Sequence, residues 1–313
     1  AAMSLVPRWL WLEARDKERV ERAATIVADY PAACIASFRR HAAIELVYTS
    51  NKLEATLLRG ARAHDTVETL EALYDEMLLT PGSGGGAAGA TGGMAAAVAV
   101  AAGVPVPAGS AAAWHPDGKH SHSGGYQAQL RQHLAALMFM ERLAGQRDRP
   151  LAVADILECH GILMRGAEGV AGGTLRTVDA WAGDGHLYVD RADVPAALER
   201  AVDDYNRAVA DGKPLAATTA LLFYKVITVH PFVDGNGRLC RLLVAYALLR
   251  GGFPFPVLLT SGHKKPRSHH MHAIYAARRR SDIEELTALV YVSALAVLNK
   301  FTGAADAAEA TTT

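Results

Sequence analysis

The segment from residue 230 to residue 241 carries most of the chemistry that this chain of 313 residues could perform. It reads His-Pro-Phe-Val-Asp-Gly-Asn-Gly-Arg-Leu-Cys-Arg. It combines a histidine that can take up a proton near neutral pH (His230), a carboxylate (Asp234) and two guanidinium groups (Arg238 and Arg241). An apolar run follows at once, so the segment is expected to be a loop that leads into the start of a helix.

Such a loop has the properties of a phosphate-binding site. Gly235 and Gly237 let the backbone turn sharply around Asn236 and come close to a ligand. The N–H groups of the first helical turn and the two arginines would bind phosphate oxygens. Asp234 is a hard oxygen ligand that suits Mg²⁺ shared with substrate phosphates. With His230 as the base, the segment predicts phosphoryl or nucleotidyl transfer to a hydroxyl group.

Each part of the segment has a plainer interpretation when it is taken singly. A histidine before a proline is usually structural, and Gly-Asn-Gly is usually a turn. The whole segment, however, resembles the signature of the Fic family, His-Pro-Phe-x-Asp/Glu-Gly-Asn-Gly-Arg-x-x-Arg, at every fixed position. The resemblance implies a mainly α fold, a Fic-type helix bundle with a small β-hairpin flap.

The resemblance also implies an activity, the transfer of AMP from ATP to a Ser, Thr or Tyr hydroxyl of a target protein. A minority of the family transfers other phosphate-containing groups, and some members remove AMP, so these activities stay open as alternatives. Family members are often homodimers, although the sequence carries no interface signature of its own. The roles implied are His230 as the catalytic base, Asp234 as the Mg²⁺ ligand, and Gly235, Asn236, Gly237, Arg238 and Arg241 as the nucleotide-binding residues.

A second segment resembles the run that precedes the family's flap. Gly173-Thr174-Leu175-Arg176-Thr177 matches Gly-x-x-Arg-Thr, and Gly183-Asp184-Gly185 could turn a short hairpin. Family members dock the target backbone on this flap as an added strand, whereas an ordinary surface hairpin is the plainer alternative. The residues expected to dock a target are Val178, Asp179, Ala180, Trp181, Leu187 and Tyr188.

A third segment resembles an inhibitory helix. Ser50 and Glu54 match the family pattern Ser/Thr-x-x-x-Glu-Gly/Asn, although Ala55 departs from it. The resemblance implies that Glu54 pairs with Arg241 and blocks productive ATP binding. The alternatives are a plain helix with a surface glutamate, and a permanently inhibited nucleotide-binding regulatory protein. Near the expected adenine site, residues 267–272 lack a tyrosine until Tyr275, and the basic run 278–280 is expected to be a solvated helix end.

Periodicity and composition predict the remaining organisation. Apolar spacing favours helices around 130–138, 155–164, 194–210, 218–229, 235–250 and 283–298. We expect N-terminal helices over 1–80, with the inhibitory helix around 44–60, and a disordered Gly/Ala-rich insertion over 81–125. The Fic core is expected over 126–300 and a flexible tail over 301–313.

Composition argues against several classes of partner. The formal net charge is zero and half of the residues are hydrophobic, so nothing draws the chain to nucleic acid or to an acidic membrane. No stretch approaches the roughly 20 apolar residues of a membrane span, and no signal peptide is evident. The three cysteines are scattered, which favours free thiols and a cytoplasmic location. The chain begins Ala-Ala-Met, which leaves a preceding targeting segment open.

Overall fold

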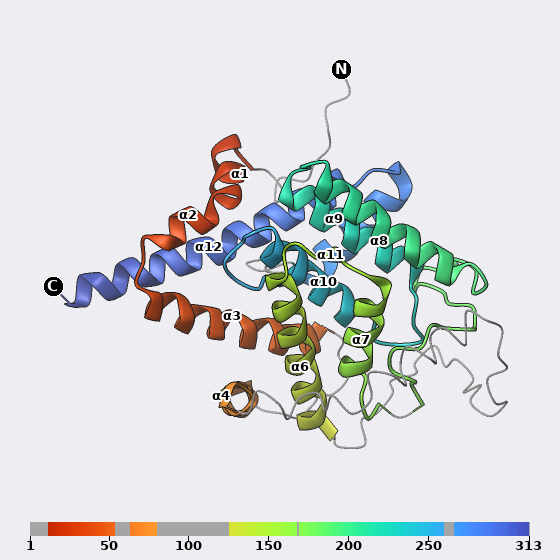
Figure 1. Ribbon diagram of the computed structural model, residues 1–313, viewed down its shortest axis with the longest axis horizontal. Helices are drawn as coiled ribbons and strands as arrows, with labels where there is room; N and C mark the ends of the chain where they lie inside the picture. The colour runs from red at the N-terminus through yellow and green to blue at the C-terminus, as the bar shows by residue number, and fades with distance from the viewer. Residues whose placement is uncertain (1–11, 54–62, 80–124, 168, 260–265, 313) are drawn as a thin grey trace.

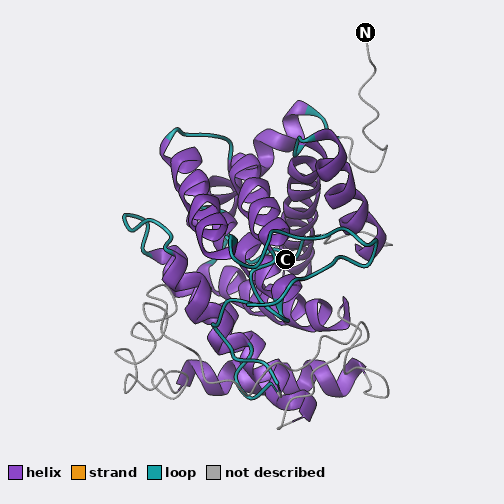
Figure 2. Ribbon diagram, turned by 90° about the vertical axis from the view of Figure 1, so that its right-hand side faces the viewer, coloured by secondary structure: helices purple, strands orange, loops and turns teal. Residues whose placement is uncertain are grey.

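The computed structural model describes residues 12–53, 63–79, 125–167, 169–259 and 266–312. Helices dominate these residues, and no β-strand forms in the described ranges (Figure 2). Trp181 and Leu187 make an isolated antiparallel bridge. The helices are α1 (Ala14–Glu21), α2 (Ala23–Ala28), α3 (Ala32–Leu53), α4 (Ala63–Leu79), α6 (Gly125–Gly145), α7 (Val153–Leu163), α8 (Val194–Ala210), α9 (Leu215–Val229), α10 (Asn236–Arg250), α11 (Pro266–Arg280) and α12 (Glu284–Thr312).

The centre of the bundle is α10, which packs against α9 and α6 (Figure 1). Nearly every residue of α10 from Asn236 to Leu249 is buried, so this helix is apolar or neutralised on all sides. Helix α8 covers α9, α7 lies beside α6, and α12 packs against α9, α11 and α3. Because α10 is enclosed in this way, the loop at its N-terminus is held by a rigid scaffold.

The loop between α9 and α10 follows from local backbone rules. Helix α9 ends at Val229 because His230 takes the left-handed conformation, with φ at 50°, and Pro231 follows it. Helix α10 begins after Gly235, whose φ of 81° favours glycine. The six residues between the two helices, 230–235, therefore form a tight turn that places His230 and the start of α10 close together.

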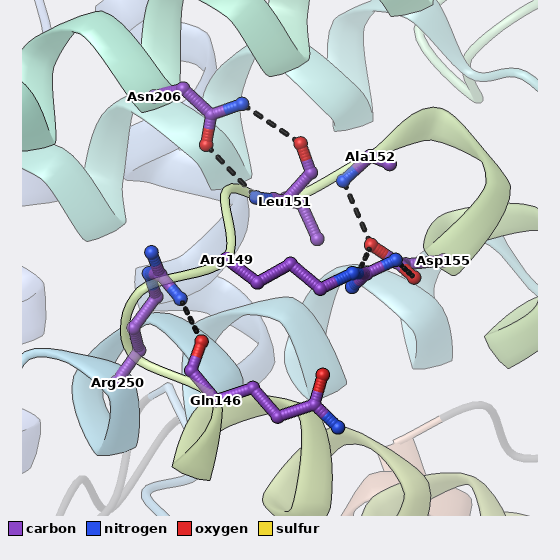
Figure 3. A network of polar contacts seen from close by, with 7 residues as sticks. All are labelled: Gln146, Arg149, Leu151, Ala152, Asp155, Asn206 and Arg250. Carbon is purple, nitrogen blue, oxygen red and sulfur yellow. Dashed lines mark hydrogen bonds and ion pairs between the residues drawn. The ribbon is translucent and has the colours of Figure 1, made fainter.

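The turn between α6 and α7 is fixed by side-chain contacts to the backbone (Figure 3). The Asp155 carboxylate accepts from Arg149 at 2.7 and 2.9 Å and from the N–H of Ala152 at 2.8 Å, which caps the start of α7. From α8, Asn206 makes two hydrogen bonds with the backbone of Leu151, at 3.1 and 2.8 Å. These contacts hold α7, which carries His160 and is followed directly by Met164, against the α9–α10 loop.

Helix α3 crosses the bundle beside α12 and contacts α4, α6, α10 and α12 (Figure 1). Arg40 makes a bidentate ion pair with Asp75 of α4 at 2.8 and 2.9 Å, and Glu45 pairs with Lys300 of α12 at 2.7 Å. Both pairs are partly exposed, so they orient α3 more than they stabilise it. The C-terminal end of α3 is thereby directed toward α10.

The described fold differs from the sequence expectations in three places. The tail predicted from residue 301 is a continuation of α12, because Phe301 is buried against Tyr30, Phe38 and Phe255. The stretch Glu284–Ala305 of α12 is long and apolar enough to cross a membrane by composition, which the sequence reading missed; half of it is buried, as in a core helix. The predicted disordered insertion, 81–125, lies outside the described residues except for its last one.

The predicted β-hairpin flap is the third difference, since no ladder forms among the described residues. Within residues 178–189, Trp181 and Leu187 make an isolated bridge around a turn closed by a hydrogen bond from Ala182 N–H to the His186 carbonyl at 2.8 Å. The carbonyls at the two ends of the segment, Val178 and Val189, accept from a side chain (Arg176) instead of from an opposite strand. We call residues 178–189 the flap from here on.

Candidate functional site

The candidate site lies where α9 ends and α10 begins. His230 is half-buried, and its Nδ1 atom is fully buried. The ring of Tyr188 from the flap stacks on the imidazole, with 4.0 Å between ring centroids and 8° between the planes. The stacked ring fixes the plane of the imidazole, and burial raises the pKa of the Tyr188 hydroxyl. His230 can therefore exchange a proton with a substrate only through Nε2.

Asn236 braces the loop from inside. Its side-chain oxygen accepts from Phe232 N–H at 3.1 Å and its NH₂ group donates to the Phe232 carbonyl at 2.7 Å. The residue is buried, and this pair of bonds spans the turn. The sequence predicts a phosphate-binding role for Asn236. Its side chain is instead engaged with the loop backbone, so its contribution to a phosphate site is the shape of the turn.

Asp234 stands at the mouth of the loop. One carboxylate oxygen accepts from the N–H of Gly235 at 2.6 Å, and the other lies 3.6 Å from the guanidinium of Arg238. The side chain is about one-third exposed. No group of three or more His, Cys, Asp or Glu side chains gathers anywhere in the described ranges. A divalent cation here would rest on this carboxylate and on phosphate oxygens, an arrangement that Mg²⁺ accepts.

The two arginines of the loop point into the protein from the first turns of α10. Arg238 and Arg241 are each only 4% exposed. Arg238 lies 3.3 Å from the sulfur of Met164, in addition to its contact with Asp234. Two buried guanidinium groups beside the N-terminus of α10 concentrate positive charge at one place, which favours an anionic ligand such as a polyphosphate.

Arg241 is already engaged by the end of α3. Its Nε donates to the hydroxyl of Ser50 at 2.7 Å, and its Nη2 donates to the Ser50 carbonyl at 3.2 Å. Ser50 is completely buried. The structure thus brings together two residues that the sequence analysis singled out for different reasons. Glu54, the predicted inhibitory carboxylate, lies just beyond the end of α3 and outside the described residues.

The next residue of α3 is held by a histidine that sequence reasoning missed. The side chain of Asn51 donates to the Val47 carbonyl at 2.7 Å and to Nδ1 of His133, on α6, at 3.0 Å. His133 is fully buried, and its pKa lies well below the ordinary value because of burial and the positive charges of Arg238 and Arg241. His133 is therefore neutral and accepts the hydrogen bond from Asn51.

His160 on α7 is the second histidine that the sequence did not reveal. Its Nδ1 accepts from Gly173 N–H and its Nε2 donates to the Asp234 carbonyl, both at 2.9 Å. The ring stacks on Phe232 with 3.6 Å between centroids. Burial is the main reason that the pKa of His160 falls to about 4. A neutral His160 with its proton on Nε2 connects Gly173, which precedes the flap, with Asp234 in the α9–α10 loop.

The flap residues divide into two groups. Trp181, Leu187 and Val178 are exposed apolar side chains, as a docking surface requires, and Val233 of the loop adds a fourth. Ala180, by contrast, is buried, Asp179 pairs with Arg191 at 3.0 Å, and Tyr188 covers His230.

Arg278 of α11 reaches the turn of the flap. It pairs with Asp184 there at 3.2 Å, so this arginine is not the solvated helix end that the sequence predicted. Its guanidinium also lies over the ring of Tyr275 on the same helix. Arg278 thus ties the turn of the flap to α11.

Comparisons with known proteins agree with this architecture. Residues 150–248 match the model of the Fic/DOC family. The protein adenylyltransferases Fic of Drosophila willistoni and Drosophila melanogaster are each 32% identical over 127 residues, 41% of this chain. The chain covers only about a quarter of the length of these relatives, 24% and 25% respectively.

Two solved structures share the fold over most of the chain. A Fic domain containing signaling protein from Bacteroides thetaiotaomicron is 17% identical, with a TM-score of 0.63, and the match covers 94% of this chain and 97% of that one. Fic-1 from C. elegans is 18% identical, with a TM-score of 0.60, and the match covers 94% of this chain and 74% of that one. At these identities the likeness concerns the fold alone.

Proposed function

We propose, from the premise that residues 150–248 form a domain of the Fic/DOC family, that this chain is a protein adenylyltransferase. It would move AMP from ATP to a Ser, Thr or Tyr hydroxyl of a target protein. The observation that carries the proposal is the pair of buried arginines, Arg238 and Arg241, at the N-terminus of α10, next to a base that can act only through Nε2.

The residues of the site would divide the reaction between them. The N–H groups at the start of α10, from Gly235 to Gly237, and the two arginines would bind the phosphates of ATP. The hydroxyl oxygen of the target attacks the α-phosphorus, and its proton goes to Nε2 of His230. The bond from the α-phosphorus to the bridging oxygen breaks, and pyrophosphate leaves.

Asp234 is the residue that would hold Mg²⁺. When bound, the ion would neutralise part of the phosphate charge. The bonds from Gly235 N–H and His160 to Asp234 fix the loop around this carboxylate. The exposed apolar side chains of the flap, Trp181 and Leu187, would take up the target as an extended segment.

We further propose that the end of α3 inhibits this activity. The guanidinium of Arg241 is needed for the terminal phosphate, and it is held by two hydrogen bonds to Ser50. Glu54, four residues after Ser50 in the sequence, would add a carboxylate to the same guanidinium. ATP could then bind only with its α-phosphate misaligned, and misalignment alone costs orders of magnitude in rate.

One experiment tests the activity directly. The Glu54→Gly variant is incubated with ATP labelled at the α-phosphate and with a cell lysate, and the labelled proteins are identified. We expect strong labelling that is absent when His230→Ala is added, although that variant should still bind ATP. Equal labelling with and without His230 would refute the proposal.

Mass spectrometry of a labelled target decides between the alternatives for the same site. AMP and phosphate add different masses, so phosphorylation is recognised at once. Loss of AMP from a pre-modified target would identify removal instead of transfer. A chain that binds ATP but modifies nothing, even as Glu54→Gly, would be a nucleotide-binding regulatory protein.

A further inference from the structure

Arg176 lies where the flap meets the α9–α10 loop, and it is almost completely buried, at 2% exposure. Its Nε donates to the carbonyl of His230 at 2.7 Å, and Nη1 donates to the carbonyl of Val178 at 2.8 Å. Its Nη2 donates to the carbonyls of Val189 and of Val229, the latter at 3.2 Å. One guanidinium thus binds four backbone carbonyls.

These four carbonyls belong to two separate pieces of the site. Val178 and Val189 are the two ends of the flap, and Val229 and His230 are the last turn of α9 and its cap. The C-terminus of a helix carries partial negative charge, so the end of α9 suits a buried cation. The backbone N–H of Arg176 also donates to the carbonyl of Pro231 at 2.9 Å. The arginine therefore joins the flap to the loop with both its backbone and its side chain.

The same connection reaches the imidazole itself. Tyr188, whose ring stacks on His230, directly precedes Val189, whose carbonyl Arg176 binds. We propose that Arg176 is a positioning residue that keeps the flap and His230 in one arrangement, so that a target segment lying on the flap presents its hydroxyl to the base. The proposal rests on the proposed transferase function for its catalytic consequence, but the coupling of flap and base stands on the geometry alone.

A guanidinium group suits the binding of four carbonyls better than other side chains do. Its planar fork presents five N–H donors in fixed directions, whereas the ammonium of lysine is a compact point charge with three. A lysine at position 176 would reach some of the four carbonyls and leave the others without their donor. A glutamine would lose the charge as well. The coupling between the flap and His230 should therefore weaken in the order Arg176, Arg176→Lys, Arg176→Gln.

The first measurement reports on the stacking of flap and base without any reaction. The parallel Tyr188 ring shifts the proton resonances of the His230 imidazole. NMR spectra of the histidine-labelled, full-length unsubstituted protein are therefore compared with those of two variants, Arg176→Gln and Tyr188→Leu. The second variant lacks the ring. We expect the His230 resonances in Arg176→Gln to move most of the way to their positions in Tyr188→Leu. Unmoved resonances would overturn the proposal.

The second measurement separates positioning from general destabilisation. Hydrogen exchange is followed at the flap amides of Ala182 and Tyr188 and at amides of α8. We expect the flap amides to exchange about tenfold faster or more in Arg176→Gln while α8 is unchanged, as for local opening. An equal rise in α8 would mean that Arg176 serves stability alone, and would overturn the proposal. Arg191→Gln is the matched control, because Arg191 also pairs with the flap but is exposed.

The third measurement concerns transfer, in the Glu54→Gly background. We expect kcat to fall and the KM for the target protein to rise, together lowering kcat/KM by about a hundredfold in Arg176→Gln, while the KM for ATP stays within about twofold. Arg176→Lys should lie between. A loosened flap with unchanged kcat/KM, or full activity of Arg176→Lys, would overturn the proposal. No transfer even with Arg176 intact would refute the proposed function instead, and the first two measurements would still decide the coupling.

Discussion

The hydrogen bond between Ser50 and Arg241 gives the sharpest prediction about inhibition. The Ser50→Ala substitution removes the hydroxyl that accepts from Nε of Arg241 at 2.7 Å and leaves the weaker bond to the Ser50 carbonyl at 3.2 Å. Both residues are buried, so water does not replace the lost partner. The end of α3 should therefore hold Arg241 less tightly, and the released arginine becomes available to ATP.

The magnitude follows from the kind of bond that is lost. A hydrogen bond to a charged group contributes about 1.5–3 kcal/mol. If the inhibited state dominates the population, this loss increases the released fraction by about tenfold to a hundredfold. We expect the rate of AMP transfer to rise by that factor, and the free energy of unfolding to fall by about 1–2 kcal/mol, because a buried guanidinium loses a partner.

The assay is incorporation of label from ATP labelled at the α-phosphate, with urea unfolding of the same variants alongside. Thr49→Ala is the matched control, one position earlier on α3 and half-buried. Adding Ser50→Ala to Glu54→Gly should raise the rate no further, because both substitutions release the same arginine. Two results for Ser50→Ala would refute the idea that Ser50 restrains Arg241: a rate of AMP transfer within twofold of that of the unsubstituted chain, or a rate that falls together with the free energy of unfolding.

Three other predictions follow from the same contacts. His133→Leu removes the acceptor of Asn51 and should also raise AMP transfer severalfold; an unchanged rate would show that α3 does not need this contact. Acid should destabilise the protein: His160 titrates near 4 when folded and near 6.5 when unfolded, so the unfolded state takes up the proton first. Stability from this residue is complete above about pH 7, and about 3 kcal/mol is lost as pH falls toward 4. Urea unfolding at pH 7 and 4.5 should show this loss, and His160→Gln should show less of it. Gly235→Ala should cost about 1–3 kcal/mol and weaken ATP binding by calorimetry, because φ is positive and the new Cβ would lie 2.7 Å from the Met164 sulfur. Gly183→Ala in the flap turn, where a Cβ meets nothing within 4 Å, should change neither.

Much of the site could be predicted from the sequence because its parts are local. The turn from His230 to Gly235 depends on a proline and on a glycine with positive φ, and both act within a few residues. The helices over 194–210 and 235–250 agree with α8 and α10 to within a residue, since their apolar faces are continuous. The Ser50 position was found because it lies in a short pattern that resembles an inhibitory helix.

The flap and the tail were harder to predict because distant residues decide them. The segment 178–189 has the turn and the apolar residues of a hairpin, yet its end carbonyls are bound by Arg176 rather than by a facing strand. Composition predicted a flexible tail from residue 301, but Phe301 packs in an aromatic cluster. Its partners come from the α2–α3 connection (Tyr30), from α3 (Phe38) and from the α10–α11 segment (Phe255). Neither outcome can be read from a window of neighbouring residues.

The sequence by itself therefore determined which chemical groups lie close together along the chain: a histidine, a carboxylate and two arginines around the start of a helix, in an order that resembles a family signature. Only the tertiary structure decided which distant side chains contact these groups. Ser50 meets Arg241 across 191 residues, Asn51 meets His133 across 82, and Arg176 meets His230 across 54. The physical reason is that the sequence around a hydrogen-bonding side chain does not identify a distant partner. Only folding brings the two residues together.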